Sequence, residues 1–391
     1  MKLATNSTSK NIAITTFIVL IVYLVINIVQ FSLPLYLKFL GLTFSVLGLV
    51  MSLSSFIRVI TSFVTGFVMR LHGICRTFML GCVLTSVSIF LLCSKDVNVI
   101  TLSRALFGIS GSLLIPSLWT FVSSVASKSD MPGRVVSLCN MMTGIGMILG
   151  FSISGFLITL IGYESLFVLA SILMLLTLPL AYVVGISEEY KPRCIISLRM
   201  LLSRLKNFKL FLLFLVAFFE MYILYSWLTF TQVYLKIVGF DKRVIGLIMS
   251  LEVVIYTILQ PAVGYLIDKL GKVSPLLLCT APIYGLLLSL IPHTKDLLHI
   301  ILLMIGIAVV TSPYAPTVFT LLTLLTSEEE REVVVSTFFT FIHIGIGLGQ
   351  AITGVLSQFS LSVAYAHLGF LTIIMFLIGL VLYLRHYRAV L

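Results

Sequence analysis

LYLKFLGLTFSVLGLVMSL, from Leu35 to Leu53, returns later in the chain as VYLKIVGFDKRVIGLIMSL, from Val233 to Leu251. The offset of 198 residues keeps five pairs of identical residues in register: Tyr36/Tyr234, Lys38/Lys236, Gly41/Gly239, Gly48/Gly246 and Ser52/Ser250. The same offset relates Gly66 to Gly264, Gly73 to Gly271 and Gly108 to Gly306. Similarity kept over this length predicts a chain built from two related halves.

The composition places both halves in a membrane. The 391 residues are 60% hydrophobic and 10% charged, with a mean hydropathy of +1.18, whereas soluble domains carry roughly 25% charged residues. Because a spanning helix needs roughly 20 apolar residues, we expect an all-α membrane protein of about twelve transmembrane helices in two pseudo-symmetric six-helix bundles. The expected spans are 12–35, 44–69, 77–93, 98–125, 137–160, 165–185, 209–235, 244–267, 274–292, 298–325, 334–357 and 363–384.

These spans predict five parts of the chain: an N-terminal tail (1–11), a bundle (12–186), a linker (187–208), a second bundle (209–385) and a C-terminal tail (386–391). Most lysines and arginines fall in the loops on the side of the two termini, which places both termini in the cytoplasm. The net charge of +11 therefore indicates a lipid bilayer as partner and not nucleic acid. The basic linker contains an amphipathic portion, 195–208, which either lies on the membrane surface or is a plain tether.

Two short motifs carry a family resemblance. GYLIDKLGK, from Gly264 to Lys272, and RALFGISGSLLIP, from Arg104 to Pro116, resemble the signature loop and the arginine and glycine motif of the major facilitator superfamily. The loop pattern is filled by Gly264, Asp268, Lys269, Gly271 and Lys272, and its repeat partner keeps Gly66 and Gly73 but has Arg70 in place of the aspartate. The resemblance implies a transporter and no enzyme, without cofactor or metal. GIGMILGFSISG is similar to the family's antiporter motif, with Phe151 where proline is expected.

Four charged residues lie deep inside the expected spans: Arg58, Arg104, Glu220 and Glu252. A charge at the bilayer centre costs at least ~2.5–3.5 kcal/mol, so such residues usually face protein or water and have a function. We expect them to bind substrate or a coupling ion, and the alternative is internal ion pairs that hold helices together. Either glutamate is a candidate to take up a proton, since dehydrated surroundings favour the neutral carboxyl group.

Further candidates follow from helical spacing. Asn27 and Gln30 share a polar stripe in the first span, Trp227 shares one with Glu220, and His343 lies at a midplane depth in the eleventh span. The resemblance places the first and seventh helices at the cavity. Aromatic packing and interhelical hydrogen bonds are the alternatives. The pieces GIGMILG and GIGLG lie in apolar spans, which favours close helix packing over nucleotide binding.

A conformational latch is predicted at the cytoplasmic ends. Family members commonly use the loop aspartate, here Asp268, to contact the opposite half near a helix start. In the first half Arg70 replaces it, and the segment before the eleventh span is acidic and contains Glu329. We therefore expect a latch of inverted sign between Arg70 and this acidic segment. Two solvated charge runs that never meet are the alternative.

The sequence thus favours a monomeric secondary transporter in the plasma membrane. We expect it to move a small organic solute by alternating access, coupled to protons, with efflux of a drug or metabolite as one direction. A facilitator or an organic-anion or sugar uptake carrier, with Arg58 and Arg104 as counter-charges, is the alternative. A non-transporting receptor, scaffold or channel on the same fold is the alternative from another class.

Overall fold

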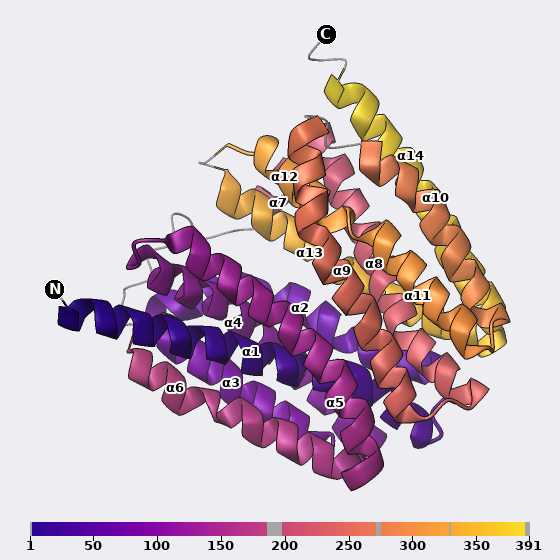
Figure 1. Cartoon of the computed structure of the whole chain (residues 1–391), viewed down its shortest axis with the longest axis horizontal. Coiled ribbons are helices and arrows are strands. Elements are labelled where there is room, and N and C mark those ends of the chain that lie inside the picture. Colours follow the sequence, from indigo (N-terminus) through magenta and orange to yellow (C-terminus); the bar gives the residue numbers. More distant parts are fainter. Residues whose placement is uncertain (1, 186–197, 271–274, 328–329, 388–391) are drawn as a thin grey trace. The chain divides into compact units, whose positions relative to one another are not determined.

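The computed structural model describes residues 2–185, 198–270, 275–327 and 330–387, which form helices joined by short turns (Figure 1). The first half of the chain contains α1 (Lys2–Phe39), α2 (Phe44–His72), α3 (Ile74–Leu91), α4 (Val97–Ser127), α5 (Pro132–Leu175) and α6 (Thr177–Val184). A short helix, α7 (Leu198–Arg204), precedes the second half. That half contains α8 (Phe208–Val238), α9 (Lys242–Leu270), α10 (Pro275–Leu290), η1 (Ile291–His293), α11 (Leu297–Thr311), α12 (Tyr314–Leu324), α13 (Arg331–Phe359) and α14 (Leu361–Tyr387).

Ten segments of the described chain are long and apolar enough to cross a membrane. One of them, Pro132–Val184, has 53 residues and is interrupted at Gly162, where φ is 80° and ψ 175°. This segment therefore comprises the fifth and sixth predicted spans. The ninth predicted span corresponds to α10, which has 16 residues and follows directly on four residues outside the described range. The predicted all-α membrane fold is confirmed.

The tenth predicted span, 298–325, is divided into α11 and α12 at Ser312 and Pro313. Proline lacks the backbone N–H that would continue the helical hydrogen bonds, and Pro316 removes a second donor one turn later. The Thr317 N–H instead donates to the Pro313 carbonyl at 3.1 Å, which closes the first turn of α12. In membrane helices such interruptions persist where neighbouring helices satisfy the freed groups.

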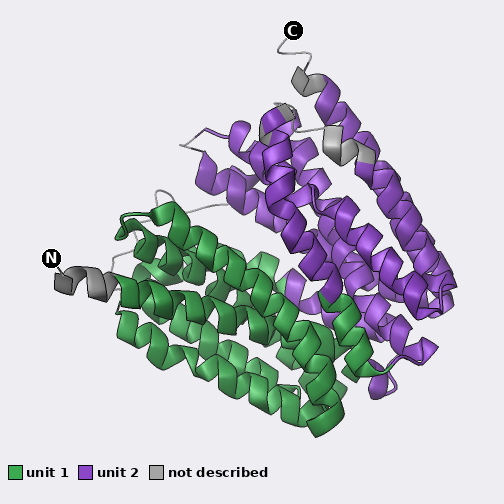
Figure 2. Cartoon of the chain, viewed as in Figure 1, with its two compact units in different colours: residues 1–36, 57–195, 241–250 green, residues 37–56, 196–240, 251–391 purple. Residues whose placement is uncertain are grey.

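The chain divides into two compact units (Figure 2). The first unit comprises residues 1–36, 57–195 and 241–250, and the second comprises 37–56, 196–240 and 251–391. Each unit thus holds most of one half of the sequence and a short helical segment from the other half. The predicted bundle limits, 12–186 and 209–385, stay predictions.

Glycines bring the helices of the first unit into close contact. A side-chain carbon at Gly150 of α5 would lie 2.7 Å from the Asn27 Cβ of α1, and one at Gly81 of α3 would lie 2.9 Å from the Leu114 Cα of α4. A side-chain carbon at Gly246, in the first turns of α9, would lie 2.7 Å from the Phe151 carbonyl oxygen. Only glycine permits these approaches without displacing backbone. The predicted packing role of GIGMILG is therefore confirmed.

The second unit repeats this pattern. A side-chain carbon at Gly349 of α13 would lie 2.9 Å from the Tyr222 Cα of α8, and one at Gly285 of α10 would lie 2.8 Å from the Gly369 carbonyl oxygen of α14. GIGLG, which ends at Gly349, thus packs α13 on α8. Elsewhere large apolar side chains remain exposed, as at Leu286 (62%) and Phe359 (81%). Such surfaces are expected where helices meet lipid.

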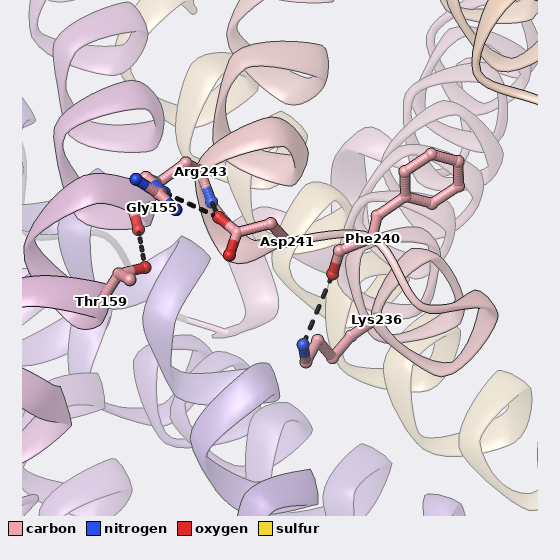
Figure 3. A network of polar contacts seen from close by, with 6 residues as sticks. All are labelled: Gly155, Thr159, Lys236, Phe240, Asp241 and Arg243. Carbon is pink, nitrogen blue, oxygen red and sulfur yellow. Dashed lines mark hydrogen bonds and ion pairs between the residues drawn. The ribbon is translucent and has the colours of Figure 1, made fainter.

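The connection from α8 to α9 shows how the sequence sets a helix start (Figure 3). Gly239 ends α8 with φ 111°, a conformation that favours glycine, and the Lys236 ammonium donates to the Phe240 carbonyl. The Asp241 carboxylate then accepts hydrogen bonds from the Arg243 backbone N–H at 2.8 Å and from its Nε at 3.0 Å. This capping bond satisfies a donor that the first helical turn would leave open.

Candidate functional site

In the first unit the two deep arginines come together. Arg104 of α4 is buried, at 4% exposed. Arg58 of α2 is near enough for its positive charge to repel that of Arg104. The Arg104 guanidinium carbon lies 4.9 Å from the centre of the Phe107 ring, an arrangement in which ring and cation attract each other. Two cations near each other in apolar surroundings repel, so this position favours an anion.

Gly111 of α4 forms the seat of the Arg58 side chain. A side-chain carbon at Gly111 would overlap the Arg58 guanidinium, with the nitrogen Nε 2.8 Å away. Gly111 belongs to the arginine and glycine motif of the sequence analysis. The structure shows why a glycine is needed there, since a side chain would overlap the Arg58 guanidinium. A larger residue at this position would displace the charge that the site presents.

Polar side chains of α1 form hydrogen bonds within the first unit. The Asn27 amide nitrogen donates to the Tyr23 carbonyl at 2.7 Å, and Asn27 is 7% exposed where α1 packs on α5. The Tyr23 hydroxyl accepts a hydrogen bond from the Trp119 indole at 3.1 Å. Gln30 is partly exposed. A role of Asn27 or Gln30 in solute binding stays a prediction.

In the second unit the two deep carboxylates lie near the same tyrosines. Glu220 of α8 is partly exposed and Glu252 of α9 is 5% exposed. Both act electrostatically on the hydroxyl groups of Tyr256 and Tyr284, and Glu220 also acts on that of Tyr314. Among the residues that the structure describes, neither carboxylate forms a hydrogen bond or an ion pair. Within that part of the chain, loss of contact with water is the only influence on the charge of each carboxylate.

Aromatic side chains surround these carboxylates. Trp227 of α8, Tyr284 of α10 and Tyr314 of α12 are 0%, 1% and 1% exposed, and the rings of Tyr284 and Tyr314 have centres 6.2 Å apart. Within the described chain, the Trp227 indole nitrogen and the hydroxyl oxygens of both tyrosines lack a partner with full hydrogen-bond geometry.

Each of these three groups has a polar neighbour in the same region. The indole lies beside the Tyr284 hydroxyl, and the Tyr314 hydroxyl lies beside Thr280 of α10. These approaches place the three groups near other polar groups of the described chain without forming a hydrogen bond of full geometry. We call Glu220, Trp227, Glu252, Tyr256, Tyr284 and Tyr314 the acidic aromatic cluster.

A separate set of polar contacts ties α8 to α13 and α14. The Tyr222 hydroxyl lies 2.9 Å from His367 Nε2, the Gln350 amide donates to the Thr229 hydroxyl at 3.0 Å, and the hydroxyls of Thr231 and Tyr365 are 2.6 Å apart. These contacts satisfy groups that would otherwise be costly to bury, so they serve packing. His343 of α13 is partly exposed, and its participation in binding or coupling stays a prediction.

The latch residues are described only in part. Gly66 of α2 and Gly264 of α9 have no atom near enough to exclude a side chain, whereas Gly73 starts α3 with φ 81° and needs glycine there. Arg70 and Lys269 are exposed. The residues Gly271, Lys272 and Glu329 and the side chain of Asp268 lie outside the described part, so the inverted latch stays a prediction.

The acidic segment before α13 does contact a basic residue in the second unit. The Glu330 carboxylate forms an ion pair with the Arg204 guanidinium at the end of α7. This contact was not expected, because the sequence predicts only that the linker lies on the membrane surface or is a plain tether. It attaches the last described part of the linker to the start of α13.

The sequence missed Tyr284 and Tyr314. Each lies in an apolar stretch without charged neighbours, and helical spacing relates residues of one helix only. A hydroxyl inside a membrane span is itself a signal, because it needs a partner there, but the sequence leaves that partner unnamed.

Comparison with known proteins agrees with this architecture. Three solved structures match nearly the whole chain: a mutant of the peptide transporter POT in complex with sulfate (16% identity, 96% of this chain and 94% of that one, TM-score 0.80), the nucleoside transporter NupG (12%, 95% and 99%, 0.79) and a bacterial homologue of the human lysosomal transporter Spinster (13%, 98% and 97%, 0.74). At these identities the similarity shows the fold alone. No curated protein sequence matches the chain.

A sequence profile of the family settles what the motifs suggest. It matches residues 15–241 and again 210–390, so the two matches together cover both halves of the duplication and nearly the whole chain. Such coverage agrees with the paired motifs, the apolar helices and the neighbouring folds. This multi-pass membrane protein therefore belongs to the Major Facilitator Superfamily.

Proposed function

We propose that this chain is a secondary active transporter that moves a small organic solute by alternating access and binds a coupling proton at Glu220 or Glu252. The two carboxylates of the second unit carry this proposal. They share the tyrosine neighbours Tyr256 and Tyr284 and have no cationic partner among the described residues. Charge in such surroundings is costly, so a proton that neutralises one carboxylate stabilises the state in which the cluster is closed to water.

Proton uptake at this position would link solute movement to a pH gradient. A ligand shifts a conformational equilibrium only by its different affinities for the two states, and a carboxylate that changes its access to water between states meets this condition. One further neighbour in fold is described as a proton-dependent oligopeptide transporter (11% identity, TM-score 0.77). The second unit of this chain offers the acidic groups that such coupling needs.

The solute must be found before coupling is measured. A thermal-stability screen of the purified protein at two pH values serves this purpose, because any ligand that binds the folded state raises its apparent stability. A nucleoside and a dipeptide are the first probes, since the neighbours in fold are named for those solutes. A screen in which no small solute stabilises the protein favours the receptor, scaffold or channel alternative.

Reconstituted vesicles then test the coupling. We expect Glu220→Gln or Glu252→Gln to abolish uptake driven by a pH gradient while exchange of labelled solute across the membrane continues. Glu164→Gln is the control, because Glu164 is exposed and pairs with Lys95. Gradient-driven uptake that is unchanged in both cluster variants would refute proton binding at these carboxylates.

A carrier of organic anions or sugars is the second candidate, favoured by the paired arginines of the first unit. Arg58 and Arg104 act on each other electrostatically, and one neighbour in fold is described in complex with sulfate. If an anion binds there, Arg58→Gln and Arg104→Gln raise the KM for an anionic solute and leave that for a neutral one unchanged. Equal effects on both solutes count against this candidate.

The orientation of the chain in the membrane belongs to the same proposal. We infer a monomer in the plasma membrane with both termini in the cytoplasm, because basic residues gather in the loops on that side. Single cysteines placed at Lys10 and at Lys295, labelled from outside intact cells, test the orientation, and labelling at position 10 would contradict it.

A further inference from the structure

We infer that the acidic aromatic cluster binds the ammonium group of an organic amine that also carries a hydroxyl or carbonyl group. The inference rests on the proposed function and names the class of its solute. It concerns residues of the second unit only. Four features of the cluster lead to it: its charge, its rings, its buried donors and the absence of a competing cation in the described part of the chain.

Two positive charges are needed to neutralise the two carboxylates of the cluster. Glu220 and Glu252 both act on Tyr256 and on Tyr284, so the same two tyrosines lie within reach of both charges. An ionised carboxylate is costly in such apolar surroundings, and this cost applies to each of the two. One proton neutralises one carboxylate, and a monovalent cation in contact with the other neutralises the rest.

The rings of the cluster fit an organic cation better than a metal ion. Trp227, Tyr256, Tyr284 and Tyr314 come from α8, α9, α10 and α12, and the last two rings lie 6.2 Å apart. Aromatic faces attract ammonium groups, and the attraction increases when the cation is desolvated. The cluster has only two carboxylates as strong oxygen ligands, whereas calcium requires about six to eight.

Three buried donors supply the independent indication of a ligand. The Trp227 indole nitrogen and the hydroxyls of Tyr284 and Tyr314 have no partner with full hydrogen-bond geometry in the described part of the chain, and all three side chains are almost completely buried. Leaving such a group without a partner costs about 1–3 kcal/mol. A hydroxyl or carbonyl oxygen of the solute would accept these hydrogen bonds while its ammonium group meets a carboxylate.

Three titratable groups in the membrane-spanning parts of α13 and α14 have other interactions. His367 of α14 contacts Tyr222, and Tyr365 of the same helix contacts Thr231. His343 of α13 has interactions of its own. Of the described charged groups, none of these helices supplies one that acts on Glu220 or Glu252. Ammonium and proton therefore compete for the same two carboxylates.

Tryptophan fluorescence tests this directly. The chain has only two tryptophans, Trp119 and Trp227, so the Trp119→Phe protein reports on the cluster alone. The probe is choline, which has an ammonium and a hydroxyl group, and the matched probes are neutral 3,3-dimethyl-1-butanol and anionic butyrate. We expect choline alone to change Trp227 emission saturably at pH 8, with an apparent Kd that rises by up to about tenfold per pH unit on acidification, as one competing proton requires.

Variants give the matched controls. Glu252→Gln weakens choline binding at least about tenfold, which equals about 1.4 kcal/mol, and Glu164→Gln leaves it unchanged. The Trp227→Phe protein, which keeps Trp119 in the first unit, shows no change in emission. Thermal stabilisation of the unmodified protein by choline but not by dimethylbutanol provides the same test without any substitution.

Two results would overturn the inference. Dimethylbutanol or butyrate that binds as well as choline shows that the cluster does not select a cation, and choline that leaves both Trp227 emission and thermal stability unchanged shows that it does not bind one. If gradient-driven uptake of another solute still depends on Glu220 or Glu252, only the amine site is lost. If choline binds with the same Kd at every pH, the competition with protons is refuted.

Discussion

Gly48 of α2 and Gly354 of α13 exclude each other's side chains. A side-chain carbon at Gly48 would lie 2.9 Å from the Gly354 Cα, and one at Gly354 would lie 2.8 Å from the Gly48 Cα. The repeat partner of Gly48, Gly246, is placed in the same way against Phe151 and Gly155 of α5. In both contacts a glycine of one sequence half packs on a helix of the other half, so the register that reveals the duplication coincides with a packing requirement.

This relationship predicts a loss of stability at either glycine. Gly48→Ala introduces a methyl group against backbone atoms, which cannot rotate away as a side chain can, and overpacking of this kind costs about 1–3 kcal/mol. We expect a lower thermal unfolding temperature in detergent. Gly66→Ala is the control on the same helix, because nothing lies within 4 Å of its new methyl group. Equal stability of the two variants would contradict the close approach.

A second prediction concerns Gly111 and the charge of Arg58. In Gly111→Ala the methyl group displaces a flexible guanidinium and no backbone, so stability changes little. Forcing a side chain from its preferred rotamer costs about 0.5–1.5 kcal/mol, which corresponds to a roughly two- to tenfold rise in the KM for an anionic solute.

The matched control is Gly133→Ala, whose surroundings are open. Combining Gly111→Ala with Arg58→Ala gives no further rise in KM over Arg58→Ala alone if the glycine acts through the arginine. Additive effects of the two substitutions would show that Gly111 acts in another way.

A third prediction follows from the ion pair between Arg204 and Glu330. Both side chains are partly exposed, at 26% and 40%, and pairs of this kind contribute ~0–1 kcal/mol. Arg204→Glu therefore has little effect on global unfolding but loosens α7 from α13, which faster hydrogen exchange in residues 198–204 would reveal.

Reversing both charges tests whether Arg204 and Glu330 contact each other or whether any change of charge near α7 has the same effect. Adding Glu330→Arg to Arg204→Glu restores slow exchange if the two groups meet. Lys206→Glu makes the same change of charge two residues along, where the side chain is exposed, and leaves exchange of α7 as it was. Failure of the double variant to restore protection would count against the pair.

A fourth prediction uses pH at the start of α11. A hydrogen bond from the His299 side chain, 2.8 Å from the Asp296 carboxylate, and a second from the His299 backbone lower the pKa of Asp296. A carboxyl group whose pKa is lower in the folded state stabilises that state above its unfolded pKa, and this contribution disappears as pH falls through the folded value.

Asparagine isolates the charge, since it caps helices about as well as aspartate. The Asp296→Asn protein should melt slightly below the unmodified protein at neutral pH, and the difference should vanish in strongly acidic buffer. A difference that stays constant across this range would show that the charge of Asp296 is not responsible.

The sequence predicts individual groups of the site better than their surroundings. Glu220, Glu252, Arg58 and Arg104 stand out because ionisable residues are expensive in hydrocarbon. Which of them meet depends on the packing of different helices, and the pattern along one helix holds no information on that. The approach of Arg58 to Arg104, and the position of Tyr284 and Tyr314 near the carboxylates, therefore emerged only in three dimensions.

Helix positions were predictable and helix interruptions less so. The span pattern separates residues 137–160 from 165–185, and the break at Gly162 falls in that gap. The division of α11 from α12 at Pro313 was not predicted, because membrane helices often continue through proline, as α1 does at Pro34. Proline alone does not determine which outcome occurs.

The contact between Gly48 and Gly354 also bears on synthesis of the chain. Ribosomes add about 5–20 residues per second, so roughly 15–60 seconds pass between the emergence of the first glycine and that of its partner. Throughout this interval the start of α2 lies in the bilayer without the surface it is shaped to fit. A nascent chain halted before α13 should accordingly be recognised as unfinished by membrane quality control, although every helix of its first half is already inserted.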